Sequence, residues 1–333
     1  MSDIRFRAMI VSENEEKKYK REIRERNTDE LPEGDVLIRV LYSSLNYKDA
    51  LSAIGNKGVT RNYPHTPGID AAGLVDESES NEFNPGDEVI VHCYDLGQNT
   101  PGGFGQYIRV PEDWIIRLPG GMTLRESMIY GTAGFTAAHC IYKLQEHGVM
   151  PGSGEILVTG ATGGVGSTAV AMLAKAGYHV VASTGKTDQK DFLKELGAKE
   201  IISREDSVDR SGKPLLKGRW SGVVDTVGGD ILATALKSTA ERGIVTCCGN
   251  VAGYELNTNV YPFILRGVEL VGIDSATCNM DLRVRIWEKI ASDWKIDNLD
   301  GITKEVALDE LSSNIELILG GKVRGRVLVN LWK

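Results

Sequence analysis

A glycine-rich run at residues 155–177, EILVTGATGGVGSTAVAMLAKAG, constrains this chain more than any other feature. Residues 156–158 form a short, continuous apolar run, which is typical of a parallel strand covered on both faces. Four glycines follow within seven residues, and they let the backbone turn sharply and approach a phosphate closely. From Val165 the apolar positions recur on one face of a helix that ends near Gly177. The run therefore predicts a strand, a tight turn and a helix whose N-terminus faces a pyrophosphate.

The context of this run favours a dinucleotide site over an ordinary glycine-rich turn. The fingerprint GxGxxG is weak evidence alone, and here Ala161 occupies its first glycine position. A second apolar run at 179–182 follows the helix, so the unit is strand–turn–helix–strand, which is the setting that the motif requires. We interpret the run as a cofactor site.

The residues after the second strand favour NADPH over NADH. Enzymes that use NAD usually place an acidic residue about 20 residues past the glycines, where it binds the ribose 2′-hydroxyl. The stretch 182–186 reads ASTGK and contains no acid before Asp188. Lys186 and Arg204, which follows a predicted strand at 200–203, are cations that would attract a 2′-phosphate. Each cation alone could be an ordinary surface charge, but together with the missing acid they predict NADPH.

Composition excludes several other classes of protein. The chain has 333 residues and a formal net charge of −8, which argues against a nucleic-acid partner or an anionic membrane surface. The first residues lack the apolar core of a signal peptide, and no segment has the length of a membrane span. The five cysteines are scattered without a CxxC pair. We expect a reduced, cytoplasmic protein whose partner is a small molecule.

The pattern along the chain predicts two domains of the α/β class. The first ~120 residues are β-rich, with strands expected at 35–41 and 87–91. Helices and strands then alternate, which predicts a doubly wound parallel sheet of the Rossmann type. In this second part we expect strands at 221–226, 243–248 and 268–273 and helices at 190–196, 231–240 and 282–294, before a last strand at 327–331. The predicted domains are residues 1–123, completed by 295–333, and residues 124–294.

Four motifs occur in an order and at a spacing that resemble the medium-chain dehydrogenase/reductase superfamily. They are LNYKDAL at 45–51, PGIDAAG at 67–73, GTAGFTA at 131–137 and TGATGGVG at 159–166. The segments 43–51, 225–228 and 262–266 are most similar to its zinc-independent quinone-oxidoreductase branch, and within that to the acrylyl-CoA reductase (YhdH/YhfP-type) group. The resemblance extends over essentially the whole chain. It implies a Rossmann domain and a β-rich GroES-like domain.

Departures from the zinc alcohol dehydrogenases predict that no metal is bound. Asn46 stands where those enzymes have a cysteine ligand, and Ile69 replaces a histidine ligand. The cysteine-rich lobe for structural zinc has no counterpart between Val91 and Gly105. His65 and His92 lie in the first domain, but neither has the spacing of a zinc ligand.

Loss of the metal changes the expected chemistry, because zinc polarises an oxygen atom in the relatives that contain it. The resemblance then implies an oxidoreductase that transfers hydride from NADPH to the β-carbon of an activated double bond, with a proton added at the α-carbon. Acrylyl-CoA, reduced to propionyl-CoA, is the leading substrate. Quinone or alkenal reduction is a second interpretation, and an NADPH-binding protein with little turnover is a third.

Tyr47 and Asn46 are the candidate catalytic residues. The phenol of Tyr47 would stabilise an enolate or relay a proton, or else its ring would form a wall beside the nicotinamide ribose. Asn46 would donate a hydrogen bond to the same substrate oxygen. We expect Asp49 to form an ion pair with Lys48, and Asp70 to cap the turn at Pro67.

The resemblance also implies the cofactor contacts. Thr162, Gly163, Gly164 and Val165 would contact the pyrophosphate, and Thr184, Gly185 and Lys186, with Arg204, the adenine-side phosphate. Tyr47, Asn250, Ile264, Ser275 and, with weaker support, Arg326 would lie near the nicotinamide. For Ile264 and Ser275, simple packing is an equal alternative.

Two further expectations concern the substrate and the assembly. Lys57 and Arg61, in a glycine-bearing loop, would bind the phosphates of coenzyme A, although solvated loop charges are the commoner case. The strand at 268–273 would pair with its copy across a two-fold axis, which predicts a homodimer.

Overall fold

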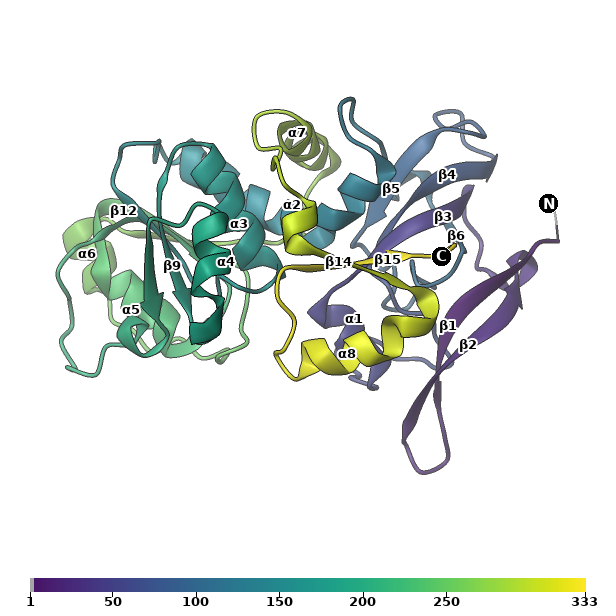
Figure 1. The fold of residues 1–333 in the computed structure, drawn as a ribbon, viewed down its shortest axis with the longest axis horizontal. Helices are drawn as coiled ribbons and strands as arrows, with labels where there is room; N and C mark the ends of the chain where they lie inside the picture. Colours follow the sequence, from purple (N-terminus) through teal and green to yellow (C-terminus); the bar gives the residue numbers. More distant parts are fainter. Residues whose placement is uncertain (1–2) are drawn as a thin grey trace. The chain divides into compact units, whose positions relative to one another are not determined.

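The computed structural model describes residues 3–333, which form two compact units (Figure 1). Unit 1 contains the described residues up to Thr132, together with Ala276–Val284 and Asn298–Lys333. Unit 2 contains Ala133–Ser275 and Arg285–Asp297. The chain thus passes from one unit to the other at Thr132, nine residues beyond the end of the first predicted domain, and Ala276–Val284 packs with unit 1.

Unit 1 is built on a mainly antiparallel β framework, in which only the β14–β15 pair of the described strands is parallel. Its strands are β1 (Arg5–Glu13), β2 (Tyr19–Asn27), β3 (Val36–Leu45), β4 (Asp70–Ser78), β5 (Glu88–His92), β6 (Tyr107–Val110), β7 (Ile115–Arg117), β14 (Thr303–Ala307) and β15 (Arg326–Asn330). Its helices are α1 (Tyr47–Ala53) and α8 (Leu311–Leu319), which pack against each other. Two longer helices, α2 (Leu124–Glu146) and α7 (Met280–Ala291), run from one unit into the other.

The sheet of unit 1 brings the end of the chain back to its beginning. Its strand order is β14-β15-β3-β4-β5-β7, with β6 also paired to β3, while β1 and β2 form a separate antiparallel ribbon. The C-terminal strand β15, yellow in Figure 1, pairs antiparallel with the purple strand β3, so that Val327 lies opposite Leu45. This pairing places Arg326, the first residue of β15, beside the start of α1.

Unit 2 has the doubly wound architecture that the sequence predicts. Its strands are β8 (Glu155–Val158), β9 (His179–Thr184), β10 (Glu200–Ser203), β11 (Trp220–Asp225), β12 (Thr239–Cys247) and β13 (Glu269–Gly272). Its helices include α3 (Gly164–Lys175), α4 (Lys190–Glu195), α5 (Gly229–Ser238) and α6 (Tyr261–Arg266). The strands are parallel in the order β10-β9-β8-β11-β12-β13, which confirms the predicted fold class.

Apolar runs explain why the central strands form. Ile156, Val158, Val223 and Val224 are almost completely buried, as expected where helices cover both faces of a parallel sheet. Complete burial of each such side chain contributes about 1.5–3 kcal/mol relative to exposure.

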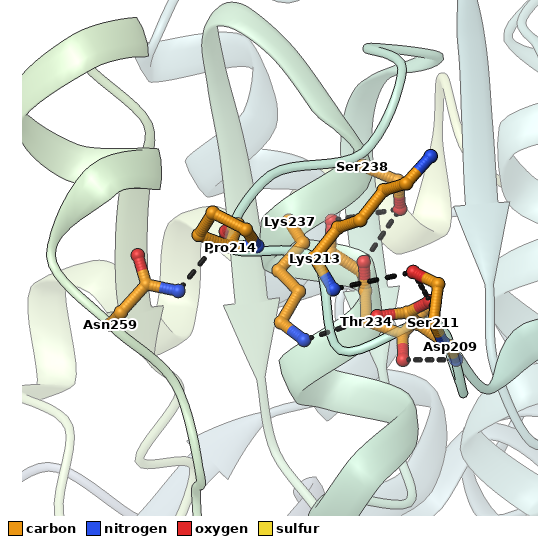
Figure 2. Close-up of polar contacts among 9 residues, drawn as sticks. Asp209, Ser211, Lys213, Pro214, Thr234, Lys237, Ser238 and Asn259 are labelled. Atoms are coloured by element: carbon orange, nitrogen blue, oxygen red, sulfur yellow. Dashed lines mark hydrogen bonds and ion pairs between the residues drawn. The ribbon is translucent and has the colours of Figure 1, made fainter.

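Polar contacts, and not apolar packing, hold the segment before β11 in place (Figure 2). Asp209 accepts a bond from Lys237 Nζ at 3.2 Å, and its amide donates to Thr234 Oγ1 at 2.8 Å.

The polar contacts of Asp209 lie at the amino-terminal edge of the sheet, because this segment precedes β11 and contacts the C-terminal half of α5. Asn259 Nδ2 also reaches Pro214 O at 3.0 Å, so the segment before α6 joins the same edge (Figure 2). The glycine turn follows the carboxyl end of β8 and therefore lies at the opposite edge. Among residues 3–333, every helix is too short or too polar to serve as a membrane span.

Candidate active site

The glycine turn of unit 2 has the geometry of a phosphate loop. Gly160 adopts φ +59°, so the sharp turn falls one residue before Ala161 and does not require a glycine at that position. A Cβ on Gly166 would lie 2.3 Å from Gly160 O, which only a glycine avoids. A Cβ on Gly163 would meet nothing nearer than 3.4 Å. The helix α3 then starts at Gly164, and the first N–H groups of a helix have no acceptor within it.

The two predicted phosphate-binding cations of unit 2 lie close together. The guanidinium group of Arg204 lies against Gly185, because a Cβ built on that glycine would be 2.8 Å from Arg204 Cζ. Burial lowers the pKa of Lys186, and the charge of Arg204 lowers it further, while Asp188 raises it. The amide of Lys186 donates to Thr184 Oγ1 at 3.0 Å, which fixes the turn after β9. Two cations thus converge at the carboxyl ends of β9 and β10.

Asn250 and Ser275 follow neighbouring parallel strands, β12 and β13, and so lie at the same edge as the glycine turn. Ser275 Oγ accepts a hydrogen bond from Thr136 Oγ1 at 2.9 Å. Ile264 lies elsewhere. It belongs to α6, whose Arg266 donates to the oxygen of Thr239 at the amino end of β12, and its side chain is 68% exposed. Unit 2 therefore does not bring Ile264 together with the other predicted contacts.

In unit 1, Tyr47 and Asn46 stand at the start of α1 in contrasting environments. Tyr47 is 44% exposed, whereas Asn46 is buried. Asn46 Nδ2 donates to Asp70 Oδ2 at 2.7 Å and to Asp49 Oδ2 at 3.2 Å, and its Oδ1 accepts from Arg326 at 3.3 Å. The predicted donation from Asn46 to a substrate oxygen would require one of these internal bonds to break.

Asp49 is a buried carboxyl and not the partner of Lys48, so the expected ion pair is wrong. Its Oδ2 accepts from the Asn46 amide at 2.7 Å and its Oδ1 from the Ile69 amide at 2.8 Å. The Asp49 side chain is completely buried. Burial, and then the charge of Asp70, raise its pKa to about 7, although the two amide donors oppose the shift.

Asp70 was expected to cap a turn, and this expectation is also wrong. It is completely buried, and its carboxylate accepts hydrogen bonds from Ser44 Oγ, from Asn46 and from both the amide and the hydroxyl of Thr132. The Thr132 hydroxyl lies 2.6 Å from Asp70 Oδ1. Asp70 therefore joins β3, β4, α1 and α2 at one buried point.

Arg326 supplies the positive charge of this network. It is 2% exposed, and its guanidinium donates to Ile129 O at 2.8 Å and to Ser44 Oγ at 2.9 Å. Burial lowers its pKa, and the carboxylates of Asp70 and Asp49 raise it. An arginine stays charged at neutral pH, so it balances a buried carboxylate beside it. Its predicted place beside the nicotinamide stays a prediction.

Gly131 makes the contact between Asp70 and Thr132 possible. Its φ of +50° and ψ of −157° break α2 just before Thr132, which turns the Thr132 amide toward the carboxylate. A Cβ at Gly131 would lie 2.4 Å from Ser44 Oγ and 2.5 Å from Asp70 Oδ2. In the sequence, Gly131 is identified only as the first residue of the GTAGFTA motif, and its contact with Asp70 was not predicted. The signal that was available was an aspartate inside an apolar strand, at Ile69-Asp70-Ala71.

The two loop cations expected to bind coenzyme A differ in their surroundings. Lys57 Nζ donates to Glu13 Oε2 at 2.8 Å and lies 4.7 Å from the ring centre of Tyr63. Hydrogen bonding to Glu13 raises the pKa of Lys57. The Arg61 guanidinium, by contrast, has no hydrogen bond or ion pair to any other described residue.

Together these features define a class of enzyme. Unit 2 is a dinucleotide-binding fold with a glycine turn and two neighbouring cations after β9 and β10, and unit 1 presents an exposed tyrosine that directly follows the buried Asn46. The protein is an oxidoreductase of the NADP-dependent type.

Comparison with known proteins places the chain within that class. Residues 32–120 match the family model of the alcohol dehydrogenase GroES-like domain, and residues 164–292 match that of the zinc-binding dehydrogenases. An acrylyl-CoA reductase of Ruegeria pomeroyi is 41% identical over 98% of this chain and 99% of its own length. The chain belongs to the medium-chain dehydrogenase/reductase superfamily, in the group that contains this acrylyl-CoA reductase.

Two crystal structures share the fold over nearly their whole length. The yhdH oxidoreductase of Salmonella enterica in complex with NADP superposes with a TM-score of 0.95 at 40% identity, covering 98% of this chain and 99% of that one. The yhfP protein of Bacillus subtilis with NAD bound gives a TM-score of 0.96 at 46% identity, covering 98% of this chain and 100% of that one.

Although one matching family is named for zinc, the side chains beside Tyr47 do not suit that ion. Zinc requires three or four N, S or O ligands, with any cysteine as the thiolate. Cys93, which lies 3.2 Å from Thr132 Oγ1, has its pKa raised to about 11 by burial and by Asp70. The Asp70 carboxylate is already occupied by hydrogen-bond donors. Among residues 3–333, no three His, Cys, Asp or Glu residues cluster as ligands would.

The raised pKa of Asp49 predicts a pH-dependent stability. Between about pH 4 and pH 7 the folded protein keeps a proton on this carboxyl that the unfolded chain has lost. This contribution to the free energy of unfolding is therefore complete at low pH and is lost as pH rises through 7, by up to about 4 kcal/mol. The Asp49→Asn variant should lose that slope in urea unfolding measured at several pH values.

Asp87 provides the matched control, because hydrogen bonds from Asn84 and Arg117 lower the pKa of this half-buried carboxyl. The Asp87→Asn variant should keep the wild-type loss of stability between pH 4 and pH 7. Identical pH profiles for wild type and Asp49→Asn would contradict the assignment.

Proposed function

We propose that this protein reduces an activated carbon–carbon double bond with NADPH and without a metal ion, and that acrylyl-CoA, reduced to propionyl-CoA, is its substrate. One observation carries the proposal. The polar groups beside Tyr47 are bonded to one another through Asp70 and Arg326, in place of a zinc ligand set, while unit 2 keeps a dinucleotide-binding fold. The relationship to the acrylyl-CoA reductase of Ruegeria pomeroyi supports the choice of substrate.

The residues that would hold the cofactor fall into two groups in unit 2. Thr162, Gly163, Gly164 and Val165 surround the N-terminus of α3 and would bind the pyrophosphate. Thr184, Gly185, Lys186 and Arg204 would bind the 2′-phosphate, because the two cations converge there. Asn250 and Ser275 remain proposed contacts of the nicotinamide end, as do Tyr47 and Arg326 in unit 1.

NADPH supplies a hydride, which adds to the β-carbon of the unsaturated thioester. The thioester oxygen then gains negative charge, and the α-carbon takes up a proton. Tyr47 is the proposed donor to that oxygen, since its phenol is exposed at the start of α1 and a phenol donates one hydrogen bond. Asn46 is proposed to position Tyr47, because its amide ties the start of α1 to Asp70.

The cofactor assignment predicts how nucleotide preference responds to charge. Lys186→Ala or Arg204→Ala should raise KM for NADPH by about tenfold or more, because each removes a charge-assisted hydrogen bond to the 2′-phosphate. KM for NADH should stay unchanged. Lys194→Ala, at an exposed lysine on α4 paired with Asp191, is the control and should behave as wild type. Equal effects on the two nucleotides would contradict the assignment.

Two variants of Tyr47 separate its two possible roles. If the phenol donates in the transition state, Tyr47→Phe should lower kcat by roughly 10²–10⁴ with little change in KM for NADPH. If the ring only forms a wall, Tyr47→Phe should keep kcat and Tyr47→Ala should raise KM for the nucleotide. We expect the first pattern; the second would exclude Tyr47 as a donor.

Quinone or alkenal reduction is the alternative function. It is favoured by one observation: Lys57, one of the two cations expected for coenzyme A, is paired with Glu13. Oxidation of NADPH measured with acrylyl-CoA, a simple quinone and a small enone tests the two. A kcat/KM at least tenfold higher for acrylyl-CoA supports the proposal, and a preference for the quinone contradicts it.

We further propose that two copies of the chain associate through the β13 edge. This strand ends the sheet order of unit 2, so one side of it has no partner strand among the described residues. Large apolar side chains gather nearby in sequence and are exposed, which is uncommon on a monomer. They are Val251, Tyr254, Leu256, Val260, Tyr261, Ile264 and Leu265.

The dimer proposal predicts that a charge on this surface separates the copies. Leu265→Glu, at a side chain that is 62% exposed, should sediment as a monomer at micromolar concentration while wild type sediments as a dimer. Leu317→Glu, at a side chain on α8 of unit 1 that is 38% exposed, is the control and should leave the dimer intact. A monomeric wild type would contradict the proposal.

Two further proposals concern the cellular compartment and the roles of the two domains. Because all five cysteines are free thiols, we place the protein in a reducing compartment, the cytoplasm. We also propose that residues 1–123 with 295–333 form the substrate domain and residues 124–294 the cofactor domain.

A further inference from the structure

A cavity of about 330 Å³ lies in unit 1, outside the network around Asp70. This volume is at the lower end of the range for small-molecule sites. Its walls come from the β1–β2 ribbon and from two loops, and the residues that line it are Ile10, Arg24, Glu25, Arg26, Glu30, Asn62, Pro64, His65, Thr66, Asn99 and Pro101.

We propose that this cavity binds the adenine ring of coenzyme A, with the Arg61 guanidinium beside its phosphates. The inference rests on the proposed function, because it concerns the nucleotide end of the acyl-CoA substrate. It assigns the recognition of coenzyme A to a site that the reacting groups do not use.

The lining suits an uncharged, planar heterocycle. Ile10, Pro64 and Pro101 provide apolar walls, and His65 is buried. Burial lowers the pKa of His65, so its ring is neutral at pH 7 and adds no charge to the wall. The lining also contains two arginines and two glutamates, whose opposite charges balance, so a cavity of this size favours an uncharged base over an ion.

Two amide side chains provide the hydrogen bonds that a base edge needs. Asn62 is exposed, and its side chain bonds to no other described residue. Asn99 donates one Nδ2 hydrogen to Asp95 at 2.9 Å and accepts from the Arg61 amide at 3.3 Å, which leaves its second N–H available. An asparagine amide matches the donor and acceptor of an adenine edge.

The charges around the cavity place the phosphates on one side. Arg24 is paired with Glu22, and Arg26 with Glu30, so these guanidinium groups are already neutralised. Arg61 is the neighbouring cation that has no partner among the described residues, and it precedes Asn62 directly. Glu25, an exposed acid in the lining, would repel a phosphate inside the cavity and accept a bond from the adenine amino group.

The bonds at Ser52 limit the distance from the cavity to Tyr47 to a length that a pantetheine arm can bridge. Ser52 lies five residues along α1 from Tyr47, and both Thr60 Oγ1 and Tyr63 Oη bond to Ser52, at 2.6 and 2.7 Å. From helix rise and chain geometry, Asn62 therefore lies within roughly 20 Å of Tyr47. An extended phosphopantetheine chain spans roughly the same length.

The test measures binding of free coenzyme A by calorimetry to the full chain saturated with NADP⁺. Asn62→Trp fills the cavity and Arg61→Ala removes the free cation; both residues are exposed, so neither change threatens the fold. Each should weaken coenzyme A binding by about tenfold or more. Lys18→Ala, at an exposed lysine on the turn between β1 and β2, is the control and should bind as wild type.

Turnover of two thioesters separates this inference from the proposed function. Both variants should raise KM for acrylyl-CoA and keep kcat, with no effect on acrylyl-pantetheine, which lacks the nucleotide. Unchanged coenzyme A binding in the variants, or equal effects on both thioesters, would overturn the cavity assignment while leaving the reductase function. Loss of coenzyme A binding in Asn62→Trp with no thioester reduced by wild type would support the cavity and overturn the function.

Discussion

A buried carboxylate, that of Asp70, is the interaction on which the candidate site depends. An ionised carboxylate inside a protein is costly unless charge and hydrogen-bond donors surround it, and removing one partner of a buried ion pair costs about 3–5 kcal/mol. Asp70 receives donors from Ser44, Asn46 and Thr132, and the charge of Arg326 lies beside them. Four segments that are distant in sequence are thereby held at one point, at the start of the helix that Tyr47 begins.

The same network fits the proposed chemistry without a metal. In place of ligands that converge on an ion, the side chains satisfy one another, and Asn46 uses its amide to join the two carboxyls. The second carboxyl is that of Asp49. Burial and the nearby charge of Asp70 raise its pKa to about 7, so it is protonated below that pH and adds no second negative charge. Electrophilic activation of the substrate then falls to a hydrogen-bond donor, which is the role that we propose for Tyr47.

The sequence predicted elements whose signal is local. Burial on both faces made β8 recognisable as an apolar run, and the glycine turn followed from residues adjacent in the chain. The sequence did not predict hydrogen bonds between residues that are remote in the chain. Asp70 accepts from Thr132, which is 62 residues away, and Arg326 donates to Ser44, which is 282 residues away. Periodicity carries no information on such pairs. The two loop cations show the same limit. Lys57 pairs with Glu13 of the distant strand β1, whereas the Arg61 guanidinium has no partner among the described residues.

The most direct test of the account is the activity of metal-free enzyme. Protein dialysed against a strong chelator, with zinc content measured by mass spectrometry, is assayed for NADPH oxidation by acrylyl-CoA. If the reaction needs no metal, the enzyme should keep its full kcat at negligible zinc content. Activity that disappears with the metal and returns in proportion to added zinc would contradict it.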